Sequence, residues 1–330
     1  MDAEGWIKSV IRGLMCVSGI IGNHWLGFSA LPKSRAHLKT NDILFVNLAS
    51  SNLITNYLVD LPDMMDFTYN FLMGQMYCSV FNFCSDLSET SSIFTTLFIT
   101  VFWHQKLVGS LKRGGAPVQL DNIRLVAALL AGSWIVAIAF SLPHIFLASK
   151  NNGNNTYFEC LEDYPSLEAK QAYDLMYLVF ANIIPIIGIF FTSIQITVTL
   201  LQNQKRINSN TTAVTTGAKN TKITPAEPSL HSNQSSQEAV RNSNAVVPNP
   251  GQARSSSSSG SVLRAAKSVV TVATIFLICW VVHVILRLIS TIQESSLIME
   301  LASYIGAAYT CIIPYIYLHG VKKFSCTCRG

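Results

Sequence analysis

Long runs of apolar residues alternate along the chain with shorter polar segments. Seven of these runs approach the roughly 20 residues that a helix needs to cross a bilayer. They cover approximately Ile7–Phe28, Ile43–Met65, Cys78–Phe102, Ile123–Ala148, Ala172–Leu201, Ala265–Ile289 and Leu297–Leu318. Strands would need alternating apolar and polar positions, which stretches such as VAALLAGSWIVAIAFSL do not show. Because unsatisfied backbone groups are unfavourable in lipid, the pattern predicts an all-α membrane protein, a bundle of seven transmembrane helices.

One polar segment, residues 202–262, is much longer than the other connections. It is rich in Ser, Asn and Thr, includes the run SSSSSG and contains four prolines: Pro225, Pro228, Pro248 and Pro250. A segment with so few apolar residues cannot bury enough surface to fold, so we expect a disordered third cytoplasmic loop. The chain is thereby divided into helices one to five with their loops (1–201), this loop, helices six and seven (263–319) and a short cytoplasmic tail (320–330).

The distribution of basic residues predicts the orientation of the bundle. With the N-terminus outside, all but five of the 23 Lys and Arg residues fall on the inner side; the exceptions are Lys8, Arg12, Lys150, Lys170 and Arg287. Cytoplasmic loops carry such an excess, so we expect the C-terminus inside and a multi-pass protein of the plasma membrane. Only 12% of the residues are charged, against about 25% in soluble domains. The net charge of +5 therefore reflects topology and not nucleic-acid binding.

Two outer cysteines are candidates for a disulfide. Cys78 begins the third run and Cys160 lies in the second outer loop, so both face the oxidising side of the membrane. The same loop carries the glycosylation acceptor Asn154-Asn155-Thr156, which predicts a glycan on Asn154. On the inner side, Cys326 and Cys328 follow the last run beside two lysines. This setting suits palmitoylation, and two reduced thiols without a modification are the alternative.

Ionisable side chains inside the spans mark a candidate ligand site, because a charge in a bilayer normally faces a partner or a water-filled cavity. Two acids of helix three are three residues apart, and a histidine and an arginine of helix six are four apart, so each pair shares one helix face. With the helix-six tryptophan and two residues of helix seven, the candidate ligand-binding residues are Asp86, Glu89, Trp280, His283, Arg287, Glu300 and Tyr304. A structural ion pair between Arg287 and one of the two helix-three acids is the alternative. Asp60, near the outer end of helix two, is expected at a solvated rim.

Catalytic and metal-binding motifs are absent from the sequence. HEXXH and GXSXG do not occur, and the seven histidines are scattered, so we expect neither an enzyme nor a metal or other cofactor. A transporter or channel is a further alternative, but we see no internal repeat and no pore-lining filter of the kinds those proteins use.

Several motifs resemble those of class A G-protein-coupled receptors. They are GIIGN with Asn23, NLASSN with Asn52, Trp134, Pro185, Cys279-Trp280, and Pro314 with Tyr317. Other positions depart from that plan. The family's Asp-Arg-Tyr would fall on Phe102, Trp103 and His104, its helix-six proline on Val282 and the Asn of its NPxxY motif on Ile313. Since Asn52 stands where the family usually has an Asp, the resemblance implies that the family's polar sodium pocket is absent.

The segment KTNDILFVNLASSNLI is similar to helix two of the vomeronasal type 1 receptors and their fish relatives, the olfactory receptor class A-like proteins. This resemblance implies detection of a small odorant or pheromone in chemosensory neurons, with coupling to a heterotrimeric G protein of the inhibitory type. Trp280 would form the pocket floor, and helix six would swing outward at its inner end. The residues facing the G protein would be Trp103, His104, Gln105, Lys106, Arg264 and Lys267. A receptor of the bitter-taste family, or another divergent class A small-molecule receptor, is the alternative.

Overall fold

The computed structural model describes residues 3–32, 38–64, 75–111, 118–150, 160–217, 250–293 and 296–320, and for part of these residues, including 207–217 and 250–262, it describes the backbone only. Its long helices are α1 (Ala3–Ala30), α2 (Thr40–Thr55), α5 (Gln75–Leu111), α6 (Ile123–Leu147), α8 (Ile184–Gly217), α9 (Pro250–Gln293) and α10 (Ser296–Gly320). The shorter elements are the π-helices η2 (Asn56–Asp60) and η4 (Tyr177–Ile183), the α-helices α3 (Leu61–Met64) and α7 (Leu167–Met176), the 3₁₀-helix η3 (Gln119–Asp121), and the strands β1 (Ala148–Lys150) and β2 (Cys160–Glu162).

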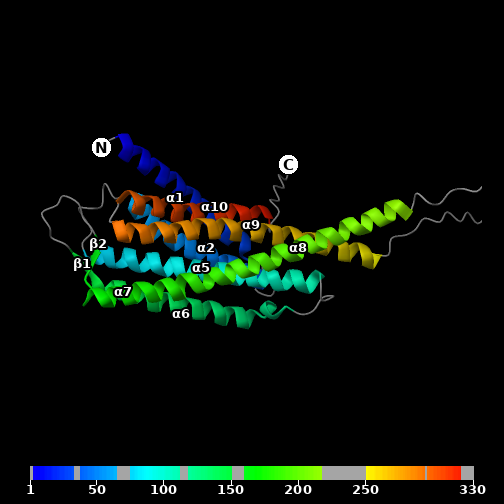
Figure 1. Ribbon diagram of the computed structural model, residues 1–330, viewed down its shortest axis with the longest axis horizontal. Coiled ribbons are helices and arrows are strands. Elements are labelled where there is room, and N and C mark those ends of the chain that lie inside the picture. The colour runs from blue at the N-terminus through cyan, green and yellow to red at the C-terminus, as the bar shows by residue number, and fades with distance from the viewer. Residues whose placement is uncertain are drawn as a thin grey trace, which may run out of the picture.

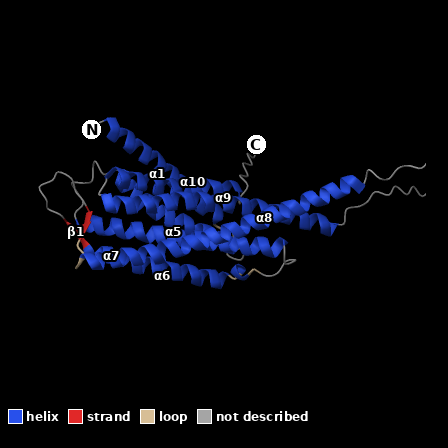
Figure 2. Ribbon diagram, in the orientation of Figure 1, coloured by secondary structure: helices blue, strands red, loops and turns tan. Residues whose placement is uncertain are grey.

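These elements form a bundle of seven helical passes, counted over the described ranges (Figure 1). The second pass is continuous through α2, η2 and α3, and the fifth through α7, η4 and α8. The antiparallel strands β1 and β2 lie at the same end of the bundle as the N-terminus, and α8 and α9 project beyond the opposite end (Figures 1 and 2). The predicted fold class, a seven-helix bundle, is confirmed.

Four described stretches are long and apolar enough to span a bilayer: Ile123–Leu147, Leu167–Arg206, Leu263–Leu286 and Glu300–His319. Their outward faces carry large apolar side chains; Phe146 is 75% and Ile135 67% exposed. Apolar side chains on the outside of a helix bundle are stable in contact with lipid. The chain is therefore a multi-pass membrane protein.

Two passes contain a π-helical turn next to a proline. The backbone N–H of Leu61 donates to the carbonyl of Asn56, and that of Ile184 to Val179, each across five residues. The prolines that follow, Pro62 and Pro185, have no N–H to donate. A wide turn of this kind absorbs the missing bond and changes the direction in which the side chains beyond it point.

The helix boundaries differ from the expected ones on the inner side. Helix α5 continues to Leu111, nine residues beyond Phe102, where the third apolar run is expected to end. Helix α8 reaches Gly217 and helix α9 begins at Pro250, so both helices extend into the segment 202–262, whose disorder stays a prediction. Extending an existing helix adds one hydrogen bond per residue without a new nucleation step, which lets polar residues continue it. Residues 218–249 lie outside the described ranges.

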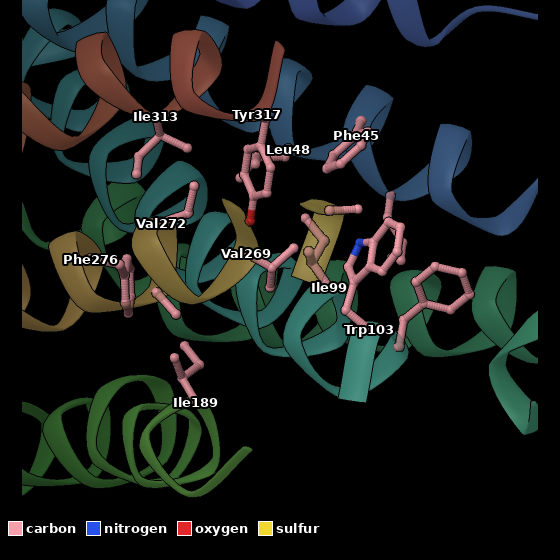
Figure 3. Close-up of a cluster of buried hydrophobic side chains, with 14 of the residues drawn as sticks. Phe45, Leu48, Ile99, Trp103, Ile189, Val269, Val272, Phe276, Ile313 and Tyr317 are labelled. Atoms are coloured by element: carbon pink, nitrogen blue, oxygen red, sulfur yellow. The ribbon is translucent and has the colours of Figure 1, made fainter. Parts of the chain in front are cut away.

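A single apolar cluster fills the inner half of the bundle. It draws side chains from α2, α5, α8, α9 and α10, which Figure 3 shows converging. Trp103 and Tyr317 belong to this cluster, and the ring centroids of Tyr317 and Phe45 are 4.8 Å apart. These contacts fix the relative positions of the helices that carry the outer cavity.

Candidate functional site

The outer half of the bundle encloses a cavity of about 470 Å³ between α1, η2, α5, α9 and α10. A volume of this size suits a small organic molecule. Four of the predicted ligand-binding residues line it: Glu89, Trp280, His283 and Glu300. The other acidic and basic lining residues, Arg12 and Asp60, are not among the predicted ligand-binding residues. Asp60 was expected at a solvated rim, and this expectation is wrong.

Aromatic rings of α9 form one wall of the cavity. The rings of Phe276 and Trp280 are stacked with centroids 5.6 Å apart, and Trp280 stacks on His283 at 5.2 Å. The indole Nε1 of Trp280 donates to Oδ1 of Asn182 at 2.9 Å, across to the π-helical turn η4. His283 Nδ1 donates to the backbone carbonyl of Ala302 at 2.8 Å, which fixes that ring nitrogen as the protonated one. Hydrogen bonds to the fifth and the seventh pass therefore hold this aromatic wall in place.

The mouth of the cavity is held by contacts between α1 and α10. Lys8 Nζ and Glu300 Oε2 form an ion pair at 2.9 Å. The guanidinium of Arg12 lies 4.8 Å from the ring centroid of Tyr304 and donates to Ser303 Oγ at 3.2 Å. The Tyr304 hydroxyl donates to the carbonyl of Lys8 at 3.3 Å, so this predicted ligand residue contributes to the α1–α10 contact and is not part of the cavity lining.

A chain of hydrogen bonds runs from the cavity into the core. Asn56 Nδ2 donates to Asp60 Oδ2 at 2.8 Å, and Asn23 Nδ2 donates to Asn56 Oδ1 at 3.3 Å. Asn52 Nδ2 donates to Asn23 Oδ1 at 3.0 Å. Gly19 allows the close approach of α1, since a Cβ there would lie 2.8 Å from the Asn56 amide. One lining carboxylate is therefore connected to helices one and two by neutral amides.

The same chain continues to α5 and α10. Ser92 Oγ donates to Asn52 Oδ1 at 3.0 Å, and the hydroxyl of Tyr309 lies 3.2 Å from Ser92 Oγ and 2.9 Å from Thr96 Oγ1. Asn52 is neutral and its amide oxygen accepts from the Ser92 hydroxyl, and the absence of a polar sodium pocket stays a prediction. Tyr309 and Ser92 also line the cavity, so the chain begins and ends at its wall.

A second cluster of charged groups surrounds His144, a residue that the sequence analysis did not single out. His144 Nε2 lies 2.8 Å from Asp86 Oδ2, and His144 Nδ1 is hydrogen-bonded to Glu162 Oε1. Two ionised carboxylates can only accept, so the ring must carry both protons and a positive charge. Asp86 is thereby directed to His144, and it does not line the cavity as predicted. The three residues lie on α5, α6 and β2, far apart in the sequence, so the cluster becomes visible only in the folded structure.

The His144 cluster also affects the outer loop. Burial alone would raise the pKa of Glu162, but the hydrogen bond from His144 and its charge hold that pKa below the usual value. Asn82 Nδ2 donates to Glu162 at 3.0 Å. The hydroxyl of Tyr173 donates to the carbonyl of Phe140 at 2.5 Å and lies 3.1 Å from His144 Nε2. The cluster therefore joins the third, fourth and fifth passes to the strand that precedes the fifth.

The remaining predicted sites are placed in part. Cys78 is disulfide-bonded, and Cys160 begins β2, where it pairs with Lys150, but its side chain is not among those described. Arg287 lies within α9 with its side chain likewise outside the described set. Asn154, Cys326 and Cys328 lie outside the described residues altogether. The Cys78–Cys160 pairing therefore stays a prediction.

Replacing Cys78 or Cys160 with serine is expected to reduce surface delivery strongly, because removing a native disulfide typically costs about 2–5 kcal/mol. Flow cytometry of an epitope-tagged receptor would measure it. Cys84→Ser is the matched control, since Cys84 is a free cysteine of the same helix. Equal surface levels for all three variants would contradict the predicted bridge.

The predicted G-protein-facing residues separate into two groups. Arg264 and Lys267 are exposed on α9, at the end of the bundle opposite the strands. Trp103 is only 5% exposed and lies in the core cluster, and its contact with the G protein stays a prediction. Lys106 covers it, with Nζ 5.4 Å from the indole centroid and 5.0 Å from that of Phe102. Gln105 Oε1 accepts from the backbone N–H of Leu120; His104 is half-buried.

Comparison with known proteins gives several distant relatives. The chain is 24% identical to melanopsin of Phodopus sungorus over 197 residues, 59% of this chain and 41% of the relative. It is 26% identical to neuropeptide Y receptor type 1 of Xenopus laevis over 189 residues, 54% of this chain and 50% of the relative. For human galanin receptor type 1 the identity is 24% over 199 residues, 58% of this chain and 54% of the relative. The matched part thus spans about half the length of these relatives.

The family comparison covers much more of the chain. The family described as "7 transmembrane receptor (rhodopsin family)" matches residues 28–317, which include the second to sixth passes complete, the seventh as far as Tyr317 and the last three residues of α1. This is a family of receptors, in agreement with the prediction that the chain is not an enzyme. The chain belongs to the rhodopsin family of seven-transmembrane receptors.

Proposed function

We propose that this receptor detects a small odorant or pheromone in the outer cavity and activates a heterotrimeric G protein, of the inhibitory type, at the plasma membrane of chemosensory neurons. The observation that carries the proposal is the cavity itself. It is of a size for a small molecule, it has a stacked aromatic wall, and its lining includes acids and a guanidinium. Apolar walls with a few polar groups are typical of small-molecule sites.

The proposed assignment to the vomeronasal type 1 group rests on the segment that contains Asp42 and Asn52. Asn52 lies in the hydrogen-bond chain to the cavity, and Asp42 caps the start of α2 by accepting from the backbone N–H of Lys39. The departures at Phe102, Trp103 and Ile313 belong to the same resemblance, and all three residues are buried in the core.

A peptide ligand is a second candidate, favoured by the names of two relatives, which are receptors for neuropeptide Y and galanin. The enclosed volume favours the small molecule. A peptide would have to bind largely outside the cavity, on the strands β1 and β2 and the α1–α10 rim.

The proposal is tested by expressing the receptor with a panel of G proteins and screening small acids, amines and steroids against a set of peptides. We expect concentration-dependent activation by a small molecule, strongest with the inhibitory-type G protein and absent in cells without the receptor. Activation only by peptides would support the second candidate. Ion current or solute flux on ligand addition, without G-protein activation, would contradict the receptor proposal and favour a channel or transporter.

A further inference from the structure

A second cavity lies on the outside of the bundle, between the fifth and sixth passes, where α8 and α9 are neighbours (Figure 1). It encloses about 730 Å³ and is lined by two stripes of side chains, within 186–198 of α8 and 270–282 of α9. In each stripe the lining positions recur every three or four residues, so they share one helix face. Several of them, such as Phe190 and Ile278, are large, apolar and exposed. Both stripes lie inside stretches that span the membrane, so the cavity is a groove open to lipid.

The three hydroxyls in the wall of this groove are already hydrogen-bonded within their own helices. Ser193 Oγ donates to the carbonyl of Ile189 at 2.6 Å, and Thr197 Oγ1 donates to that of Ser193 at 2.9 Å. Thr274 Oγ1 donates to the carbonyl of Val270 at 2.8 Å. All other lining residues are Ile, Val, Leu or Phe. A bound water needs two or more polar partners, so this lining favours hydrocarbon as the occupant.

The inner end of the groove leads to basic side chains. Lys205 follows Val198 by seven residues, and Lys267 precedes Thr274 by seven. Positions seven apart lie on the same helix face, so both lysines continue the groove, about 11 Å further toward the inner side. Both are exposed and lie near the inner ends of the two membrane-spanning stretches. The groove therefore has an apolar wall and a cationic end at the level of the lipid headgroups.

These positive charges have no acidic group beside them. Neither α8 nor α9 contains an Asp or a Glu. Within the described part of the chain, no ion pair involves Lys205, Lys267 or their exposed neighbours Arg206 and Arg264. Anionic lipids are concentrated in the cytoplasmic leaflet, where they attract basic residues at the membrane surface. The group that best complements this end of the groove is thus an acidic headgroup.

We propose that the groove binds an anionic phospholipid of the cytoplasmic leaflet, with an acyl chain between α8 and α9 and the headgroup at Lys205 and Lys267. The dimensions agree with this occupant. The stretch from Val270 to Val282 rises about 18 Å, and the hydrocarbon of one leaflet is about 15 Å thick. The site is separate from the outer cavity, and the inference does not depend on the ligand or the G protein proposed above.

Two other occupants fit the charges less well. A second copy of the chain, docked through the same face about a two-fold axis, would bring the basic ends of both copies together with no acid on either helix. A sterol would fill the apolar part of the groove, but it carries no charge to pair with the lysines.

The role of the lysines is tested with Lys205→Gln and Lys267→Gln combined. Native mass spectrometry of the full chain in detergent, with added phosphatidylserine or phosphatidylcholine of the same oleoyl chains, would measure which lipid is retained. We expect the wild type to favour phosphatidylserine by about tenfold or more, because each basic residue near an anionic headgroup contributes roughly fivefold. The preference should fall below about threefold in the double variant. Equal retention of both lipids by the wild type would overturn the proposal.

Lys39→Gln combined with Arg124→Gln is the matched control, since both residues are exposed on the inner side of other passes. This variant should keep the lipid preference of the wild type. A loss as large as that in the Lys205 and Lys267 variant would mean a general attraction of the basic inner surface, and the site would be rejected. All four side chains are exposed, so these replacements leave the packed core unchanged.

Thr274→Trp tests the apolar part of the groove, because the indole would fill the space between the two helices. We expect retention of phosphatidylserine to fall about tenfold, since the chain loses apolar contact area. Ile135→Trp is the control: Ile135 is exposed on α6, at a similar distance from the inner end of its membrane-spanning stretch and outside the groove. Wild-type retention in Thr274→Trp, or an equal loss in Ile135→Trp, would contradict the proposal.

Competition and mass identify the occupant. Neither cholesterol nor glycerophosphoserine, the headgroup without chains, should displace phosphatidylserine at equal concentration. Displacement by either, or a dimer mass that Thr274→Trp removes, would overturn the phospholipid assignment. None of these measurements involves an odorant or a G protein, so a failure of the proposed function and a failure of this inference are distinguishable.

Discussion

Replacing His144 with alanine is expected to abolish delivery of the receptor to the cell surface. The imidazolium is the shared partner of Asp86 and Glu162, and the side chains of His144 and Asp86 are only 8% and 11% exposed. Removing it leaves two carboxylates close together without a counter-charge. Breaking a buried ion pair from one side costs about 3–5 kcal/mol, a large part of the total stability of a typical domain.

Surface labelling and size-exclusion profiles of detergent-solubilised protein would measure this effect. His319→Ala is the control, because His319 is exposed at the inner end of α10, far along the bundle from the strands. A second variant tests the electrostatic cause: adding Asp86→Asn to His144→Ala should recover part of the surface level, since it removes one of the stranded charges. Normal delivery of His144→Ala would show that the cluster is dispensable.

Glu89→Ala and Arg287→Ala are expected to abolish the ligand response while the receptor still reaches the surface. Glu89 lines the cavity, and Arg287 lies one turn outward of His283 on α9. Truncating one member of a charged contact in a desolvated site costs about 2–5 kcal/mol, so the concentration for half-maximal response should rise about a hundredfold or more. Dose–response curves at matched surface level would measure the shift.

Glu168→Ala is a suitable control for these variants, because Glu168 is exposed in the first turn of α7 and lies outside the cavity lining. The conservative variants Glu89→Gln and Arg287→Lys separate charge from shape. If Glu89→Gln loses the ligand response and Arg287→Lys retains it, charge matters at both positions. The planar shape of the guanidinium then does not matter at position 287. Unchanged curves for both alanine variants would remove these residues from the site.

The seven passes were predictable because the apolar runs are long and uninterrupted, and membrane insertion leaves few alternatives to helices. Glu89 and His283 were predictable for a related reason, since an ionisable group within such a run is rare unless it faces a cavity. Arg12 stands near the start of its apolar run, where the sequence indicates only that it is one of the few basic residues on the outer side. Nothing in the neighbouring sequence indicates that α1 approaches α10.

His144 and Asp60 show what the sequence could not supply. His144 ends an apolar helix, where a single histidine resembles an ordinary interfacial residue; its two acidic partners are 58 positions before it and 18 after it. Asp60 stands near the outer end of its apolar run, where position alone suggests a solvated rim, but it lies in the wide turn η2, which carries it to the cavity wall. Both errors concern tertiary contacts and backbone geometry, which depend on neighbours that are distant in the chain.

The two π-helical turns have a consequence for how such a receptor can diversify. Each turn accommodates one more residue than an α-helical turn, so it is equivalent to a single-residue insertion. Loss of that residue would rotate the outer part of the pass by about 100°, the angle per residue of a helix with 3.6 residues per turn, and leave the inner part in place. Asn56 and Asn182, the amides that support the cavity, both lie in these turns. A change of length by one codon can therefore exchange the side chains presented to a ligand without altering the surface that faces the cell interior.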